Sequence, residues 1–291
     1  MPLPVITCLN GAYLPAAEAT IPISDRGFRF GDGVFETIRL VNGVPYQWDL
    51  HMARLSEGLA ALRFTPAEIH WARHASEVIA RNKSREGFLR LAVSRGVGSI
   101  GYLPEPRDQH VTWVIEYLPP APAITHAASL HISRIARTPL ASLPMNLKLA
   151  QGVGSTLALL EARDAGCDEA LQLTTENMLC EAASANLFWV KSGQIFTPAL
   201  SNGCLRGTTR AAVMRLASAP VCEITAPLDA LREAEGIFLT NSRSGVWPVA
   251  RVEALDWQCA ETHPLIAILD DALIHDRDAY TAQHRAQWPL A

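Results

Sequence analysis

The segment FETIRLVNGVPYQW, residues Phe35–Trp48, carries the strongest local structural signals in the chain. Its first part, Phe35–Leu40, is apolar and β-branched, which favours a strand. Asn42-Gly43 is the dipeptide typical of a type I′ turn, and the apolar segment Val44–Trp48 follows it. We therefore predict a β-hairpin at this point of the chain.

Helices and strands alternate along the chain outward from this hairpin. Asp49 is placed to cap a helix that carries leucines on one side, at positions 50, 55, 59 and 62. Further helices are predicted at residues 66–81, 155–165, 209–218 and 264–284, and further strands at residues 88–94, 111–117, 130–135, 170–174, 179–182, 186–190 and 194–196. This alternation indicates an α/β fold class.

A proline-rich segment separates the two halves of the chain. Leu118-Pro-Pro-Ala-Pro-Ala123 excludes a helix and favours an extended connector. The length of 291 residues exceeds the usual size of one domain. We therefore predict a small N-terminal domain at residues 1–120 and a larger C-terminal domain at residues 121–291.

The composition excludes several classes of partner. The net charge is −4, so nucleic acid and anionic membranes, which need a basic face, are not expected partners. No apolar run reaches the roughly 18–20 residues of a membrane span, and the N-terminal sequence does not resemble a signal peptide. We expect a cytoplasmic protein whose six scattered cysteines are reduced. The nine histidines show no metal-ligand spacing, and no metal site is expected.

Only three lysines, Lys83, Lys148 and Lys191, occur beside 22 arginines. Lys83 and Lys191 lie in polar turn sequences, where an ammonium group is simply solvated. Lys148 lies in Met-Asn-Leu-Lys-Leu-Ala, between a proline-bearing loop and an apolar helix. Burial there would favour the neutral amine, the form that condenses with an aldehyde. The alternative is a lysine whose stem lies along apolar surface and whose ammonium stays in water.

Two further segments could bind a charged ligand. Glu181 stands in the apolar sequence Leu-Cys-Glu-Ala-Ala, where a buried carboxylate needs a partner such as a protonated pyridine nitrogen. A solvent-facing strand position is the alternative. Gly203–Arg210 precedes a helix, whose N-terminus offers backbone N–H groups to a phosphate, although an ordinary capped helix has the same pattern. Gly31-Asp-Gly33 more simply makes a tight turn.

Several motifs in order resemble the class IV (fold-type IV) pyridoxal-5′-phosphate (PLP) enzymes, over nearly the whole chain. The segment Asp25–Arg39 and the sequence His51-Met-Ala-Arg54-Leu are similar to the N-terminal signatures of that family. Lys148 precedes Asp168 by 20 positions, as in the lyase and D-amino-acid branch. In the second half the resemblance also covers residues 160–171, 181–188 and 203–210.

The resemblance implies roles for individual residues. Lys148 would hold PLP as an imine and later move the proton at the substrate's α-carbon, while Glu181 would pair with the pyridine nitrogen. The groups implied to hold the phosphate are Arg54, the backbone amides of Thr208 and Thr209, and Ser242. The implied fold has a small N-terminal α/β domain and a larger C-terminal α/β pseudo-barrel domain with PLP between them. Members are usually homodimers, and the partner would be a small-molecule amino substrate.

Two reactions are open within this resemblance. Asn186–Trp189, Thr240–Val249 and Ser94–Tyr102 resemble aminodeoxychorismate lyase, which eliminates pyruvate from 4-amino-4-deoxychorismate to give 4-aminobenzoate for folate biosynthesis. This lyase is the first expectation. Ile100 stands where some lyases have an arginine, and Gln151 replaces the usual asparagine. The alternative is therefore an aminotransferase acting on branched-chain or D-amino acids.

A third hypothesis is a PLP-binding or scaffolding protein without turnover. The intact set of Lys148, Glu181 and Arg54 argues against it. The contacts to the substrate carboxylate are open. Their position in loops makes three residues candidates, Arg29, Arg95 and Tyr102.

Overall fold

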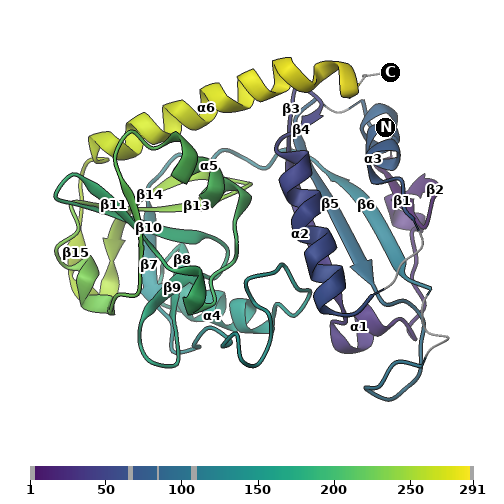
Figure 1. Cartoon of the computed structure of the whole chain (residues 1–291), viewed down its shortest axis with the longest axis horizontal. Helices are drawn as coiled ribbons and strands as arrows, with labels where there is room; N and C mark the ends of the chain where they lie inside the picture. The colour runs from purple at the N-terminus through teal and green to yellow at the C-terminus, as the bar shows by residue number, and fades with distance from the viewer. Residues whose placement is uncertain (1–3, 65–67, 84, 106–109, 289–291) are drawn as a thin grey trace. The chain divides into compact units, whose positions relative to one another are not determined.

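The structure is a computed structural model that describes residues 4–64, 68–83, 85–105 and 110–288 (Figure 1). The chain divides into two compact units. The first comprises Met1–Pro122, Lys148–Gln151 and Arg277–Ala291, and the second comprises Ala123–Leu147 and Gly152–Asp276. The break after Pro122 falls within the proline-rich segment. Lys148 groups with the first unit, whereas the two-domain prediction counts it with the second.

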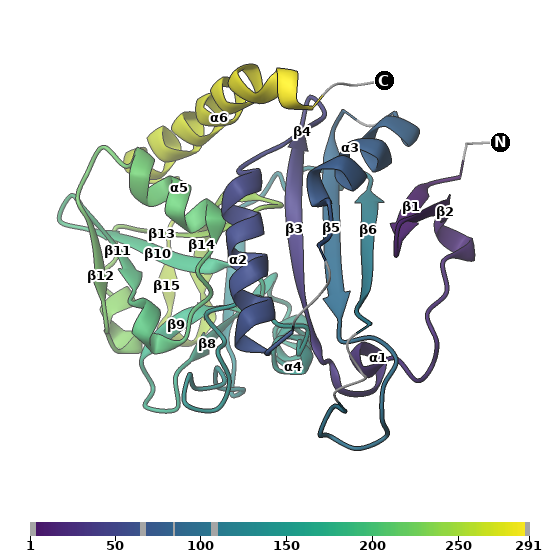
Figure 2. The ribbon, with the colours of Figure 1, turned by 45° about the vertical axis from the view of Figure 1, so that its right-hand side comes forward.

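The first unit is built on a six-stranded antiparallel sheet with the strand order β2-β1-β6-β5-β3-β4. Its strands are β1 (Ile6–Leu9), β2 (Ala12–Pro15), β3 (Gly33–Val41), β4 (Val44–Pro45), β5 (Gly87–Ser94) and β6 (Thr112–Leu118). Its helices are α1 (Arg26–Phe30), α2 (Trp48–Ala61) and α3 (Trp71–Arg81). Figure 2 shows β3, β5 and β6 side by side. Helix α2 packs on β3, and α3 packs on β1 and β6.

The predicted hairpin is confirmed, although its second strand ends at Pro45 rather than at Trp48. Its turn has the geometry expected from its sequence. Strands β3 and β4 pair through Val41 and Val44. The two residues between them, Asn42 and Gly43, have φ angles of 50° and 79°. Both angles lie in the left-handed region, which asparagine and glycine adopt more readily than other residues.

The helix after the hairpin begins before its predicted cap. Helix α2 starts at Trp48, and the residue before it, Gln47, makes no side-chain capping hydrogen bond. Asp49 therefore lies in the first helical turn, where its negative charge still interacts favourably with the helix dipole. The next helix, α3, begins at Trp71 rather than at residue 66, and residues 65–67 lie outside the described part of the chain.

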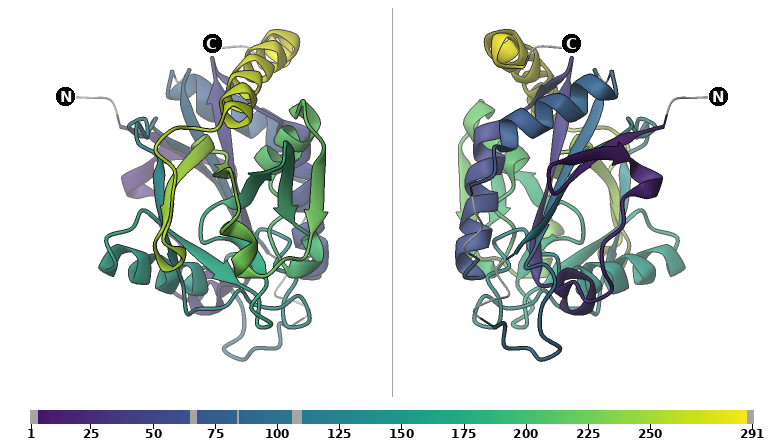
Figure 3. Two further views of the ribbon diagram at one scale, coloured as in Figure 1. Left: turned by 90° about the vertical axis from the view of Figure 1, so that its left-hand side faces the viewer. Right: turned by 90° about the vertical axis from the view of Figure 1, so that its right-hand side faces the viewer.

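The second unit contains a ring of strands. The pairing order is β12-β11-β10-β13-β14-β7-β8-β9, and β9 also pairs with β10, which closes β10, β13, β14, β7, β8 and β9 into a ring. This is the predicted pseudo-barrel (Figure 3). The strands of the second unit, inside and outside the ring, are β7 (Ala128–Ile132), β8 (Glu169–Leu173), β9 (Leu179–Ala182), β10 (Asn186–Lys191), β11 (Gln194–Pro198), β12 (Val221–Ile224), β13 (Gly236–Asn241), β14 (Gly245–Val252) and β15 (Trp257–Gln258).

The helices of this part of the chain agree with the sequence pattern. They are α4 (Val153–Asp164), α5 (Thr208–Leu216) and α6 (Pro264–His284), of which α6 continues into the first unit from Arg277. The sequence does not predict β1, β2 or β12 to β15. Four of these strands have only two to four residues, too few for a periodicity signal. Among the described residues, no helix is long and apolar enough to cross a membrane.

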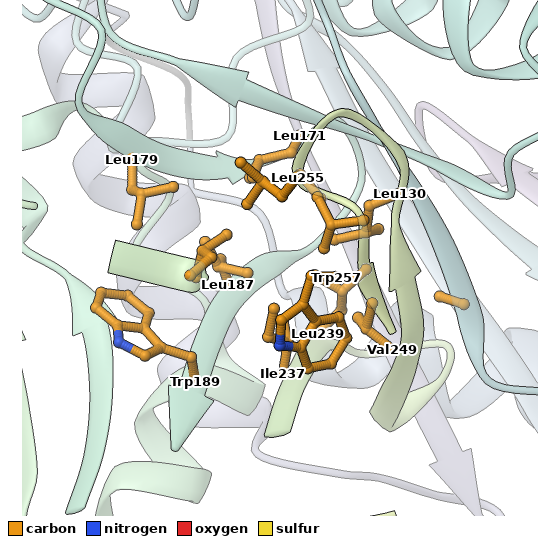
Figure 4. Close-up of a cluster of buried hydrophobic side chains, with 14 of the residues drawn as sticks. Leu130, Leu171, Leu179, Leu187, Trp189, Ile237, Leu239, Val249, Leu255 and Trp257 are labelled. Atoms are coloured by element: carbon orange, nitrogen blue, oxygen red, sulfur yellow. The ribbon is translucent and has the colours of Figure 1, made fainter. Parts of the chain in front are cut away.

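One buried apolar cluster receives side chains from all six strands of the ring (Figure 4). On β10 these are Leu187 and Trp189, and on β13 they are Ile237 and Leu239. Because side chains alternate along a strand, the residues between them point to the opposite face of the sheet. That second face positions the candidate site of this unit.

Candidate active site

Lys148 is held against β3 in the first unit by backbone hydrogen bonds. The N–H of Phe35 donates to the carbonyl of Lys148 at 3.0 Å, and the N–H of Ala150 donates to the carbonyl of Gly33 at 2.9 Å. The half-buried side chain places its Nζ 4.5 Å from the centroid of the Phe35 ring. This short segment therefore fixes the position from which the Lys148 amine projects.

The other two lysines lie in the polar surroundings that the sequence predicts. Lys83 is exposed at the end of α3. Lys191 forms a solvent-exposed ion pair with Glu233. Both side chains are exposed, so the structure separates the half-buried Lys148 from both.

Glu36, next to Phe35 on β3, is the centre of a buried charge cluster. Its Oε1 accepts a hydrogen bond from Arg54 Nε at 2.7 Å, and its Oε2 accepts one from Arg54 Nη2 at 2.6 Å. The Nδ1 of His51 lies 2.6 Å from the same Oε2. His51 and Arg54 are three positions apart on α2 and therefore share one helix face. The two parallel bonds from Arg54 hold the plane of its guanidinium group.

The electrostatics of this cluster favour one charge state at neutral pH. Burial raises the pKa of Glu36, but hydrogen bonds from Arg54 and His51 outweigh burial and lower that pKa to about 2. Burial lowers the pKa of His51, and the positive charges of Arg54 and Lys148 lower it further, against the opposing effect of Glu36. The cluster therefore contains an ionised Glu36 and a neutral His51 at pH 7.

In the second unit, Glu181 on β9 is buried and bound on both oxygens. Its Oε1 lies 2.7 Å from Nη2 of Arg137. Its Oε2 accepts hydrogen bonds from Asn186 Nδ2 and from the backbone N–H of Leu205, both at 2.9 Å. These contacts compensate for the burial of the carboxylate. The alternative of a solvent-facing Glu181 is wrong.

Helix α5 begins beside this carboxylate with no side-chain cap. Its N-cap residue is Gly207, and the first helical residues Thr208 and Thr209 are buried. A Cβ atom on Gly207 would lie only 2.0 Å from Oδ1 of Asn186. Glycine is therefore required for the helix to start this close to β10. The first N–H groups of a helix have no acceptor within the helix and form a natural anion site.

The turn that carries Ser242 is organised by side chains that the sequence does not single out. Ser242 is half-buried between β13 and β14. Asn241 Oδ1 accepts hydrogen bonds from the backbone N–H groups of residues 243 and 244, at 3.0 and 2.7 Å. Asn241 Nδ2 donates to the carbonyl of Ser184 at 3.2 Å, and the hydroxyl of Ser184 donates to the buried Glu169. Glu169 therefore supports the turn that carries Ser184 and, through Ser184, the turn that carries Ser242.

The predicted site residues fall into two groups. Arg54 and Lys148 belong to the first unit, and the second unit contains Glu181, Thr208, Thr209 and Ser242. The sequence does not identify the arginine partners of the buried Glu36 and Glu181. Arg137 is one of 22 arginines, and nothing local distinguishes it from the others. Glu36 could have been found from the alternation of side chains along β3. This alternation predicts that Glu36, although charged, points inward, as the structure shows.

The loop after β5 presents apolar side chains to solvent. The buried Arg26 donates hydrogen bonds to the carbonyls of Gly101 and Tyr102, both at 2.7 Å. The side chains of Ile100 and Tyr102 are 84% and 87% exposed. The loop is therefore fastened through its backbone while these side chains stay accessible.

Arg95 is already held by groups of the first unit. Its Nε and Nη2 bind Asp32 at 2.8 and 3.1 Å, and Nη2 also donates to the carbonyl of Leu62 at 2.8 Å. Of the three candidate residues for the substrate carboxylate, Arg29 and Tyr102 are exposed.

Comparison with known proteins identifies the family of the chain. Residues 33–252 match the family model described as amino-transferase class IV. The aminodeoxychorismate lyase of Bacillus subtilis is 28% identical over 86% of this chain and 87% of its own length. The D-alanine aminotransferase of Bacillus licheniformis is 27% identical over 91% and 94%. The solved structure of the T.th. branched-chain amino acid aminotransferase with pyridoxamine 5′-phosphate has a TM-score of 0.87, 26% identity and coverage of 97% and 98%.

The chain therefore belongs to the class IV aminotransferase family of PLP-dependent enzymes, and it has the fold-type IV architecture. The donor groups fit this cofactor. Within the first unit, Lys148 has the primary amine that an aldehyde requires, and within the second unit Glu181 has a carboxylate that could pair with a pyridine nitrogen. The uncapped start of α5 at Gly207 provides backbone N–H groups for a phosphate.

We expect Glu36→Gln to lower the free energy of unfolding at pH 7. A shift of the Glu36 pKa from 4.5 to about 2 corresponds to about 3 kcal/mol. Because the folded-state pKa is depressed, this stabilisation is present above pH 4.5 and is lost as the pH falls towards 2. Urea unfolding at pH 7 and at pH 3 should therefore show a larger difference between wild type and variant at pH 7.

Glu116→Gln is the matched control, since Glu116 forms an exposed ion pair with Arg90 at 3.9 Å. It should cost less than about 1 kcal/mol. Equal losses for the two variants at pH 7 would contradict the role assigned to Glu36.

Proposed function

We propose that Lys148 supplies the amine that binds PLP covalently, and that it moves the proton at the substrate's α-carbon. The observation that carries this proposal is the backbone attachment of Lys148 to β3, beside the buried pair of Glu36 and Arg54. When bound, PLP withdraws electrons from the substrate and so stabilises negative charge at that carbon. A pyridine ring with a protonated nitrogen is the more effective electron acceptor.

The other site residues would bind and orient the cofactor. Glu181 offers its carboxylate to the pyridine nitrogen, while Arg137 holds that carboxylate in place. Arg54 offers a permanently charged guanidinium group to the phosphate, and Glu36 fixes its orientation. The remaining phosphate ligands proposed are Thr208, Thr209 and Ser242.

The first reaction proposed is elimination of pyruvate from 4-amino-4-deoxychorismate. Lys148 would take the proton from the carbon that bears the amino group, and the C–O bond to the enolpyruvyl group would break. The released enolpyruvate takes up a proton to become pyruvate, and the ring becomes aromatic, so no oxidant is needed. The segments Ser94–Tyr102 and Thr240–Val249 support this reaction, as does the similarity to the lyase of Bacillus subtilis.

The second candidate is transamination of branched-chain or D-amino acids. Ile100 favours it, because this exposed residue is apolar where some lyases have an arginine. The loop then presents a surface suited to an apolar side chain rather than to a carboxylate. The similarity to the D-alanine aminotransferase of Bacillus licheniformis also supports this candidate.

We also propose that the chain forms a homodimer through an apolar patch on the first unit. The patch consists of Ile23, Phe28, Ile100, Tyr102 and Leu103, all at least 71% exposed. Ile23 and Phe28 lie on one segment, and the other three residues lie on the loop after β5. An isolated antiparallel β-bridge between Asp25 and Val97 joins the two segments. Exposed apolar side chains gathered in this way mark an interface, and a second copy is the partner proposed.

A reducing compartment such as the cytoplasm is the proposed location. All six cysteines of the chain are free thiols, and four of them are buried. Proteins of oxidising compartments more often join such residues as disulfides.

Lys148→Ala should abolish the covalent attachment of PLP. Borohydride reduction of the wild-type protein should leave the label on a single peptide containing Lys148, identified by mass spectrometry. Lys83→Ala and Lys191→Ala serve as controls and should keep that label. A reduced label on either of these two lysines in wild-type protein would refute the assignment.

The reaction itself can be tested with PLP-loaded protein and 4-amino-4-deoxychorismate. We expect release of fluorescent 4-aminobenzoate with one equivalent of pyruvate. Absence of both products, together with keto-acid formation from a branched-chain or D-amino acid, would replace the lyase by the aminotransferase. Inactivity with all of these substrates would argue against both reactions.

Phe28→Asp should shift the protein from dimer to monomer in sedimentation velocity, because it places a charge in the proposed interface. Ile268→Asp is the control, since Ile268 is an exposed apolar residue on α6, outside the patch. A Phe28→Asp protein that remains dimeric, or a monomeric wild type, would refute the proposed interface.

A further inference from the structure

The second face of the paired strands β10 and β13 contains one polar position that the proposed site does not use. Leu187 is paired with Leu239, and both point into the apolar cluster. One residue along each strand, Asn186 is paired with Thr240, so these two side chains share the opposite face. Asn186 binds Glu181, which places this face in the candidate site.

The N-terminus of α5 covers the same face. Gly207 lies against the side chain of Asn186, and α5 packs on β13, the strand of Thr240. The helix begins at Thr208 with no side-chain cap. Thr240 therefore lies in the region where the helix dipole and backbone N–H groups favour an anion.

Thr240 is 1% exposed, and its Oγ1 has no hydrogen-bond partner among the described residues. A buried hydroxyl without a partner costs about 1–3 kcal/mol. Other threonines at the same degree of burial are bonded. Thr197 Oγ1 donates to the carbonyl of Leu187 at 2.8 Å, and Thr7 Oγ1 donates to the carbonyl of Ile115 at 2.9 Å.

We propose that the Thr240 hydroxyl donates a hydrogen bond to the phosphate group of the cofactor, beside the N-terminus of α5. This inference rests on the proposed PLP-binding function and adds a residue to the phosphate site. Thr240 then has its partner only in the cofactor-bound protein. Its hydroxyl lowers the stability of the cofactor-free chain and raises its affinity for PLP.

Thr240→Val tests this inference, because valine keeps the shape of threonine and removes the hydroxyl. Titration of the cofactor-free, full-length chain should show a PLP dissociation constant raised roughly tenfold or more, the effect of one hydrogen bond to a charged group. Urea unfolding of the same cofactor-free chain should show a midpoint equal to or above that of the wild type. Thr240→Ser should retain PLP affinity within about threefold, because it keeps the donor.

Thr197→Val is the matched control, since its hydroxyl is equally buried but already bonded within the protein. It should lower the unfolding midpoint of the cofactor-free chain and leave PLP affinity unchanged. Pyridoxal, which lacks the phosphate, should bind Thr240→Val and wild type equally. A weaker binding of pyridoxal to Thr240→Val would place the hydroxyl on the ring and overturn the phosphate assignment.

Two results separate this inference from the proposed function. Wild-type protein that binds no PLP would refute the function itself. Wild-type protein that binds PLP, with unchanged affinity in Thr240→Val, would refute only the role of Thr240. A Thr240→Val chain destabilised as much as Thr197→Val would also refute it, since the hydroxyl would then have a partner without the cofactor.

Discussion

The pairing of Glu181 with Asn186 closes the ring of strands in the second unit. Without this pairing, β9 would have β8 as its only partner strand, and the ring of strands would be open. The same two residues share a side-chain hydrogen bond, and the close approach of Gly207 to Asn186 sets the start of α5. One pair therefore joins sheet closure, the orientation of a buried carboxylate and the position of the N-terminus of α5.

Each unit buries a glutamate against an arginine. Burial of a single charge is costly, and the cost is offset only when the charge is paired and fully hydrogen-bonded. Arg54 meets this condition for Glu36 with two parallel bonds, and Arg137 meets it for Glu181 together with two N–H donors. Such clusters hold polar groups in one orientation, which suits sites that must present charge to a ligand.

The alternation of side chains along β10 divides a motif that is continuous in the sequence. The segment Asn186–Trp189 resembles the lyases, yet its members have different roles. Trp189 is buried in the apolar cluster and stacks on Phe196, whereas Asn186 binds Glu181 on the opposite face. A sequence match over such a segment therefore reflects the packing of the apolar cluster as well as the contacts of Asn186.

The sequence by itself determined the local features: the hairpin turn at Asn42-Gly43, the order of most helices and strands, and the distinct setting of Lys148. Backbone preferences and side-chain periodicity act over a few residues, so they can be read directly. The tertiary structure decided which of 22 arginines pairs with Glu181, that Arg95 is engaged by Asp32, and that Thr240 is buried without a partner. These outcomes depend on which distant segments meet, and no local pattern encodes that.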